Sequence, residues 1–577
     1  GSTGVYVGTG SPGTVTNSGS INAANASGAG VDLAGGGAIT NNSGGSISGG
    51  AFGVFTSGAS GTLSNSGSIS GAHGVGLEAG GSVTNTTSGT ITGQSAGVFA
   101  QGGAATLSNA GIISATAGAG ADIEGGGSIT NLAGATISGS TIGVFLAGGS
   151  GTVTNAGTIS GGTYAIDFAG SATNRLVVDP GAVFVGKVIG GSGTNTLELA
   201  SGTGSIGGVG TGSFNNFQVL AVDAGATWTL NGSNIAPTVL DDGTVNIAGS
   251  LDVSTAVDPN STGLFQLGNG ATLEVAADTG TTTQVNFQGS SSELIIDNAA
   301  LFGTNVGTAS YAGPKLQAFA PGDKIDLKNF SSAGVTLSFN ASTGLLQVSN
   351  SANQVASLDF QTSSLGGPAF AAASDGAGGI FITDPPPTVI EALGSTSLVQ
   401  GGSNYFLDPV AGGIGPELNY NGSPVVLGLF NGWAPIGAEQ TTSGYDVAWK
   451  NAGLGLYTYW TTDSSGNHLT DSAPMQGTSL ALEPLETVFQ QDLNGDGVIG
   501  PTTTATKTVI QTDGSTSLTE IGSQFYYLYN SSGSGPVLQF GGVPVVAGQY
   551  GAWAPIGAVQ TASGYDVAWK NADLGLY

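Results

Sequence analysis

The sequence predicts an all-β protein: a right-handed parallel β-helix, or solenoid, followed by small β-rich modules that contain tryptophan and one short helix. Three observations lead to this prediction. A short strand phrase ending in Asn returns seven times between Gly13 and Asn174, two rows of aliphatic residues keep step with it, and the C-terminal part is duplicated at an offset of 120 residues. Repeats of this size indicate a stacked array of structural units.

The recurring phrase has the form Thr-Val-Thr-Asn, and its copies are Thr14–Asn17, Ala38–Asn41, Thr62–Asn65, Ser82–Asn85, Thr106–Asn109, Ser128–Asn131 and Thr152–Asn155. The two aliphatic rows are Ile21, Ile47, Ile69, Ile91, Ile113, Ile137 and Ile159, and Val31, Val54, Val75, Val98, Ala121, Val144 and Ile166. Each interval therefore holds three short strands, and we expect consecutive coils to pair in parallel about 4.8 Å apart. We expect the Asn row to form a ladder at a corner, because Asn tolerates a left-handed backbone.

The sequence also repeats every two coils. In every other coil the valine is followed by a phenylalanine, and these residues are Phe55, Phe99 and Phe145. If the valines point inward, the alternation of a strand directs these phenylalanines outward as an aromatic row. The alternative is a bulged register that buries the rings in the core, and we favour it because exposed aromatic rows are unusual.

The composition and charge of the chain limit which classes of partner it can bind. The chain has 577 residues, 105 of them Gly, no Cys, and a formal net charge of −28. Residues 1–174 contain no Lys or Arg, so nothing there neutralises phosphate, and nucleic acid and anionic membrane are disfavoured as partners. No apolar run has membrane-spanning length and no signal peptide is present; we expect a fragment of a larger exported bacterial protein.

The expected domains are a regular β-helix with coils of 22–23 residues over 1–174 and a less regular β-rich continuation over 175–384. A proline-rich linker precedes a first Trp-rich module over 388–502 and a truncated second module over 508–577. The Asn-Gly coils and the phrase Phe214–Leu220 resemble passenger segments of autotransporter adhesins over about residues 13–255. That resemblance implies a β-helical protein displayed outside a bacterium.

The duplicated module carries the phrases Trp433–Ala438 and Gly444–Lys450, which return as Trp553–Ala558 and Gly564–Lys570. It resembles the tryptophan-rich C-terminal domain family of large exported bacterial proteins, which implies export and repetition more than an activity. Strand alternation places Tyr445, Val447 and Trp449 on one face, where we favour a core role over a sugar-stacking platform.

Between the two copies lies a sequence with definite coordination chemistry. After a helix expected over 479–491, Asp492, Asn494 and Asp496 supply side-chain oxygens at positions 1, 3 and 5 of a loop that resembles an EF-hand or dockerin loop, and Val498 offers its carbonyl at position 7. Position 12 is Thr503, which is no carboxylate, so we expect a weaker site unless Glu486, Glu483 or water replaces the missing bidentate ligand. We expect a structural Ca²⁺ site; the alternative is a capped Asp-Gly turn without an ion.

These features favour a secreted or cell-surface structural protein, adhesin-like, that presents binding or assembly modules to cell-surface, extracellular-matrix or glycan ligands. One alternative is an ice-binding protein that uses the Thr-x-Thr rows. Another is a polysaccharide-active β-helix enzyme, but the regular coils offer no converging acid pair, and His73 and His468 have no nucleophile motif beside them. We therefore expect no enzyme.

Overall fold

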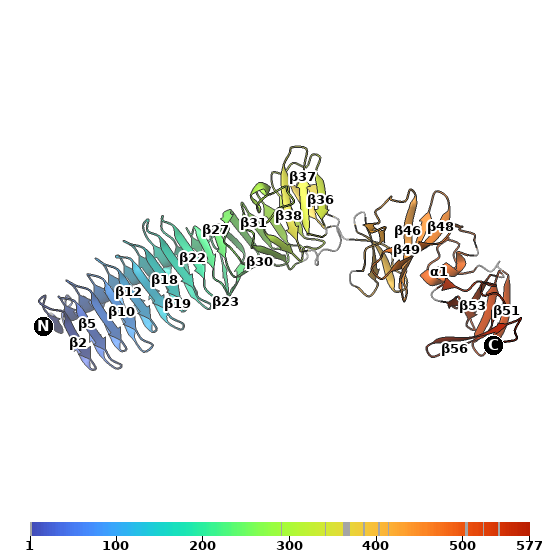
Figure 1. Ribbon diagram of the computed structural model, residues 1–577. Helices are drawn as coiled ribbons and strands as arrows, with labels where there is room; N and C mark the ends of the chain where they lie inside the picture. The colour runs from blue at the N-terminus through green and yellow to red at the C-terminus, as the bar shows by residue number, and fades with distance from the viewer. Residues whose placement is uncertain are drawn as a thin grey trace. The chain divides into compact units, whose positions relative to one another are not determined.

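The computed structural model describes residues 3–289, 291–340, 342–361, 370–384, 387–401, 404–412, 415–479, 481–501, 506–522, 524–540 and 543–577 (Figure 1). The described residues form two compact units, one ending at Asp384 and the other beginning at Pro387. The first is a β-solenoid and the second consists of small β-rich modules, as the sequence predicts. Pro385 and Pro386 of the expected linker lie outside the described residues.

One strand of every early coil carries the recurring phrase and ends at its Asn. These strands pair in parallel and in register, so that Asn lies beside Asn throughout. They are β2 (Gly13–Asn17), β5 (Gly37–Asn41), β8 (Gly61–Asn65), β10 (Gly81–Asn85), β12 (Ala105–Asn109), β15 (Gly127–Asn131) and β18 (Gly151–Asn155).

The isoleucine and valine rows occupy the other two strand positions of each coil. The isoleucine row lies on β3 (Ser20–Asn22), β6 (Ser46–Ser48), β13 (Ile112–Ala115) and β16 (Thr136–Gly139), and on the first halves of β9 (Ser68–Leu77), β11 (Thr90–Ala100) and β19 (Thr158–Phe168). The valine row begins beside β1 (Val5–Val7) and follows β4 (Ala29–Leu33), β7 (Phe52–Thr56), β14 (Ala119–Ile123), β17 (Ile142–Leu146) and the second halves of the same three long strands.

The valine row lies on one line along the stack, as predicted. Val54 is the register partner of Val75, Val75 of Val98, and Ala121 joins Val98 to Val144. These side chains and the isoleucines between them are 0–1% exposed and belong to one continuous core. A single coil could not bury them, so the stack is stable only as a whole.

The asparagines form the expected ladder, but the expected reason for it is wrong. Each Nδ2 donates to the Oδ1 of the next coil at 2.8–2.9 Å from Asn17 to Asn155, and the side chains are almost fully buried. None of these asparagines has a positive φ. The position requires Asn because its amide both joins neighbouring coils and satisfies carbonyls at the bend that follows the strand.

The favoured core placement of the phenylalanine row is also wrong. Phe55, Phe99 and Phe145 are partly exposed on the outer face, whereas the valine before each is 0–1% exposed. The register carries no bulge at these residues, so strand alternation holds and directs the rings outward.

The later coils keep the parallel stacking with shorter strands. The ladder of strands that carries the recurring phrase continues from β18 through β20 (Asn174–Val178), β22 (Asn195–Leu199), β25 (Val219–Val222), β27 (Ser233–Asp241), β29 (Ser250–Val257), β31 (Thr272–Val275), β33 (Glu293–Ile296) and β35 (Lys324–Leu327). Another contains β23 (Gly202–Gly207), β26 (Ala226–Asn231), β28 (Thr244–Ile247), β30 (Leu264–Leu267), β32 (Gln284–Phe287) and β34 (Lys315–Gln317). Two further strands, β21 (Val183–Ile189) and β24 (Phe214–Asn215), extend the sheet that carries the isoleucine and valine rows.

The solenoid ends where strand direction reverses. The last parallel pairing of β34 is with β38 (Val355–Phe360), which then pairs antiparallel with β37 (Leu345–Ser349) and through it with β36 (Thr336–Asn340). On the other ladder, β35 pairs antiparallel with β40 (Ile380–Thr383), which forms a hairpin with β39 (Ala371–Ser374). Antiparallel hairpins thus cover the end of the parallel stack.

The second unit contains the duplicated modules. The first has β41 (Thr388–Glu391), β42 (Thr396–Gly401), β43 (Asn404–Pro409), β44 (Asn419–Tyr420), β45 (Ser423–Pro424), β46 (Trp433–Gln440), β47 (Gly444–Asn451), β48 (Leu456–Asp463), β49 (His468–Asp471), β50 (Met475–Gln476) and α1 (Glu483–Phe489). The second has β51 (Lys507–Asp513), β52 (Thr516–Ile521), β53 (Phe525–Tyr529), β54 (Gln539–Phe540), β55 (Val543–Pro544), β56 (Trp553–Thr561) and β57 (Gly564–Asn571). Across the described residues, no helix is both long enough and apolar enough to cross a membrane.

Candidate functional site

The central sheet of the first module separates two sets of buried side chains. Tyr445, Val447 and Trp449 lie on one face of β47 and are 8%, 0% and 2% exposed, which confirms the predicted core role. The opposite face of the strand carries Ala448, which packs in the cluster that includes α1. The alternation of one strand therefore builds an aromatic layer on one side and a helix-covered layer on the other.

The aromatic layer is a cluster of four rings in mutual contact. Trp449 and Trp460 lie closest, with ring centroids 4.4 Å apart. Phe430 packs edge-on against both, at 5.5 and 5.2 Å, and Tyr420 stacks on Trp460 at 5.5 Å. Edge-to-face and offset contacts at these distances are the favourable geometries for aromatic pairs.

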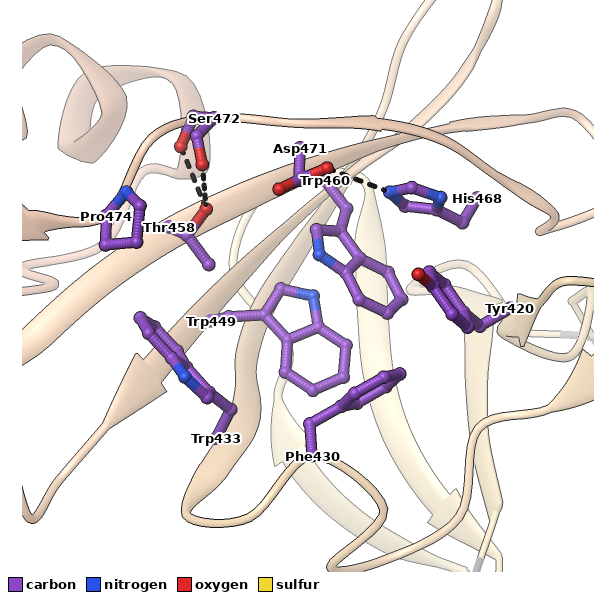
Figure 2. Close-up of a pocket in the computed structure, with 10 residues that line it drawn as sticks. All are labelled: Tyr420, Phe430, Trp433, Trp449, Thr458, Trp460, His468, Asp471, Ser472 and Pro474. Carbon is purple, nitrogen blue, oxygen red and sulfur yellow. Dashed lines mark hydrogen bonds and ion pairs between the residues drawn. The ribbon is translucent and has the colours of Figure 1, made fainter.

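This cluster forms part of the wall of a cavity of about 250 Å³. Figure 2 shows Trp449 and Trp460 between the other rings and the polar side chains that line the cavity. The lining residues are Tyr420, Phe430, Trp433, Trp449, Thr458, Trp460, His468, Asp471, Ser472 and Pro474. Small-molecule sites of about 300–1,000 Å³ are lined mainly by apolar and aromatic groups with a few polar ones, and this cavity lies just below that range.

The polar groups of the cavity divide into those already engaged and those available. The Thr458 hydroxyl donates to the Ser472 carbonyl at 2.8 Å, and the Ser472 hydroxyl accepts from the Tyr459 backbone N–H at 3.1 Å. The Asp471 carboxylate is 65% exposed and lies 3.7 Å from Nε2 of His468. Asp471 is therefore the acceptor that is open to a ligand.

The indole N–H groups of the cavity have no hydrogen-bond partner among the described residues. The Nε1 atom of Trp449 is buried without a hydrogen-bond partner. Among the hydrogen bonds of the described residues, none involves the Nε1 atoms of Trp433 or Trp460. An open carboxylate beside indole donors suits a neutral ligand whose hydroxyl groups both donate and accept.

The second module repeats part of this arrangement. Phe540, Tyr550 and Trp569 stand where the first module has Tyr420, Phe430 and Trp449, and their successive ring centroids lie 5.8 and 5.7 Å apart in edge-on contacts. The ring positions are kept while the tyrosine hydroxyl moves from one ring to the other. The shared feature is therefore the aromatic geometry.

Sequence reasoning identified Trp449, considered His468 only as a possible base, and missed Tyr420, Phe430 and Trp460. These residues come from separate strands and loops, and the pocket exists only once the sheet has folded. The duplication held a usable signal, because both Tyr420 and Phe430 are replaced by another aromatic residue in the second copy.

The predicted calcium ligands Asp492, Asn494 and Asp496 lie in one exposed loop that follows α1, and Val498 is exposed beside them. Two carboxylates, one amide oxygen and one carbonyl are ligand types that calcium accepts, but four are fewer than the usual six to eight. Within the part of the chain that the structure describes, no group of three or more His, Cys, Asp or Glu residues could hold a metal ion. Thr503, the predicted position 12, lies outside the described residues.

The side-chain oxygens of this loop hold its backbone. Asp492 accepts from the N–H groups of Gly495 and Gly497 at 2.7 and 2.8 Å, and the amide oxygen of Asn494 accepts from the N–H of Asp496 at 2.8 Å. This is the bonding of capped Asx turns. The ligand set thus fits calcium in kind, and the loop is also held without an ion.

Glu486 of α1 supports the same loop from inside. Its Oε1 accepts from the N–H groups of Leu493 and Asn494, its Oε2 accepts from the N–H of Gly500 at 3.0 Å, and its side chain is fully buried. Burial raises the pKa of this carboxyl to about 7, against the lowering effect of those hydrogen bonds. Both oxygens are thus committed to the backbone, which disfavours Glu486 as the missing calcium ligand.

The fold and the cavity together define a β-solenoid repeat protein that carries aromatic-rich β modules. Residues 396–500 match the family described as the tryptophan-rich Synechocystis species C-terminal domain. No curated protein matches the chain. The match covers the first module, which contains both the aromatic cavity and the acidic loop.

Proposed function

We propose that this chain is a secreted or cell-surface structural protein of adhesin type, in which the solenoid is the scaffold and the Trp-rich module binds glycan. The observation that carries the proposal is the aromatic cavity beside the Asp471 carboxylate. An aromatic face packs against the C–H face of a sugar ring, while a carboxylate and indole N–H groups serve its hydroxyls. A volume of about 250 Å³ suits one sugar ring.

The surface role is supported by the solenoid itself. Its first 174 residues present a Ser, Thr, Gly and Asn surface with no Lys or Arg, and they resemble autotransporter passengers. Labelling of intact producing cells with an antibody to the module tests the location; signal only after lysis would contradict it.

Binding is tested by titrating the whole chain with methyl glycosides of glucose, galactose, mannose and N-acetylglucosamine, followed by tryptophan fluorescence and calorimetry. We expect Trp433→Ala and Asp471→Asn each to weaken binding of the preferred glycoside about tenfold, equivalent to about 1.4 kcal/mol. The matched control is Trp553→Ala, the equivalent residue of the second module. Equal affinity of wild type, W433A and D471N, or no binding to any glycoside, would contradict the proposal.

We also propose a structural Ca²⁺ in the loop of Asp492, Asn494, Asp496 and Val498, with water completing its coordination. The ion would fix the loop against α1. Calcium should raise the melting temperature of the second unit in the wild type and not in the D492N/D496N double variant, with magnesium as the control ion. An unchanged melting temperature together with no heat of binding would remove this site.

A second candidate is ice binding, favoured by the outer hydroxyl rows of the first ladder. The residues before and after the central aliphatic residue of each phrase point out of the solenoid, and their register forms two regular rows of mainly Thr and Ser. Thermal hysteresis of the whole protein tests this candidate. We propose no catalysis, and release of reducing sugars from polysaccharides on incubation with the chain would overturn that part of the proposal.

A further inference from the structure

A single row of side chains on the outer face of the solenoid alternates between aromatic residues and aspartates. Register pairs connect its members coil by coil. In order along the stack they are Tyr6, Asp32, Phe55, Gly76, Phe99, Asp122, Phe145 and Asp167. We call this row the aromatic–acid ladder.

The ladder faces solvent, because its members alternate along each strand with core residues. Val31, Val54 and Val98 are 0–1% exposed, whereas Tyr6 is 62% exposed and the ladder phenylalanines are partly exposed. Gly76 interrupts the row, and the Phe52 ring fills the space beside it: a Cβ added at Gly76 would lie 2.5 Å from that ring. Figure 1 shows the coils stacked side by side along the N-terminal part of the solenoid.

The ladder acids have no cationic partner in the described structure. Asp32, Asp122 and Asp167 form no ion pair among the described residues, and residues 1–174 contain no Lys or Arg. One carboxylate oxygen of Asp32 and one of Asp122 are buried without any hydrogen bond. Each of these acids lies between bulky residues of the coils above and below, which removes water from it without supplying a counter-charge.

A cation placed over this row would meet both kinds of side chain it prefers. An ammonium or guanidinium group is attracted to an aromatic ring face and to a carboxylate, and the attraction grows when the groups are desolvated. The formal net charge of −28 adds long-range attraction for a basic partner. Charge complementarity therefore points to a positively charged occupant.

The spacing of the acids limits how the positive charges of that occupant can be spaced. Asp122 and Asp167 are two coils apart and Asp32 and Asp122 are four coils apart, which is about 10 and 19 Å at about 4.8 Å per coil. A polyproline II segment rises about 3.1 Å per residue with three residues per turn, so every third side chain returns to the same face about 9 Å further along. We propose that the aromatic–acid ladder binds an extended basic segment of a partner protein, with Lys or Arg at every third position.

The test uses the whole chain and two fluorescent peptides of equal composition. One is Lys-Ser-Ser-Lys-Ser-Ser-Lys-Ser-Ser-Lys, and the other has its four lysines contiguous followed by six serines. We expect the spaced peptide to bind more tightly, by fluorescence anisotropy at low salt, and its affinity to fall as salt is added. Equal binding of the two peptides, or no binding of either, would overturn the proposal.

Variants separate the ladder from general electrostatics. Asp122→Asn and Phe99→Leu should each weaken the spaced peptide about three- to tenfold, whereas Asp573→Asn, which removes the same charge from the second unit, should not. Melting curves establish that each variant is folded. If D122N binds as wild type does, the proposal fails. If F99L loses binding of neutral oligosaccharides while D122N keeps it, the ladder is a glycan surface and the basic segment is wrong.

Discussion

The buried asparagine ladder gives a sharp prediction about stability at Asn85. Its Nδ2 donates to Oδ1 of Asn109 at 2.9 Å and to the carbonyls of Gly89 and Ile112 at 3.0 and 3.2 Å, and its Oδ1 accepts from Asn65 at 2.9 Å. Asn85→Ala removes all four bonds in a fully buried place. At about 1 kcal/mol net for each bond, the expected loss is about 2–4 kcal/mol, because Asn65 and Asn109 keep other partners.

Asn85→Asp should cost more than Asn85→Ala at pH 7. The carboxylate cannot donate, and it would place negative charge against three acceptors, the Asn109 oxygen and the two backbone carbonyls. Those surroundings favour the protonated acid and raise its pKa in the folded state. The folded variant then binds more protons than the unfolded chain, so its stability should rise as the pH falls.

The assay is hydrogen exchange of the intact chain, read by mass spectrometry for β8, β10 and β12, with β29 as a distant reference. A local measurement is needed because stacked repeats do not unfold as one two-state unit. Thr84→Ala is the matched control, since that neighbouring side chain points to solvent. An Asn85→Ala protection loss equal to that of Thr84→Ala would refute the view that the amide ladder holds the coils together.

Three further predictions follow from single residues. Gly97→Ala should destabilise its own coil and the next by about 1–3 kcal/mol, because its Cβ would lie 2.6 Å from a backbone oxygen of the next coil. Gly19→Ala, with open space around it, should be neutral, and hydrogen exchange of β3 and β11 measures both effects. Burial raises the pKa of Asp241 to about 7, so Asp241→Asn should stabilise the fold by up to about 4 kcal/mol above pH 7, and melting curves should show this gain vanish toward pH 4. Glu486→Ala should speed proteolysis within the 492–500 loop at least severalfold, because three backbone N–H groups lose their acceptor; an unchanged cleavage rate would contradict its holding role.

The solenoid could be predicted from the sequence because the residues buried inside it recur at the length of one coil. A row such as Val54, Val75 and Val98 must return once per coil to stay inside the stack, so the spacing reveals the architecture. The position of Asn85 was equally visible as a repeat. Its chemistry was not, because the hydrogen bonds join residues whose distance depends on how the coil bends.

The candidate site was predictable only in part. The duplication marked Trp449 and the alternation of its strand placed it in a core, which the structure confirms. The cavity also needs Tyr420 and His468, which are supplied by other strands and which no sequence spacing connects to Trp449. The predicted calcium ligands Asp492 and Asp496 belong to a motif that a single loop contains, and calcium binding there stays a prediction.

The reversal of strand direction at the end of the solenoid has a consequence for assembly. A stack of parallel coils presents an open backbone edge that could template addition of further chains, as in amyloid fibrils. Here the hairpins β36–β37–β38 and β39–β40 engage that edge with strands of the same polypeptide. A further chain that added to these two ladders at this end would first have to displace strands of the same polypeptide, which disfavours end-to-end assembly through them.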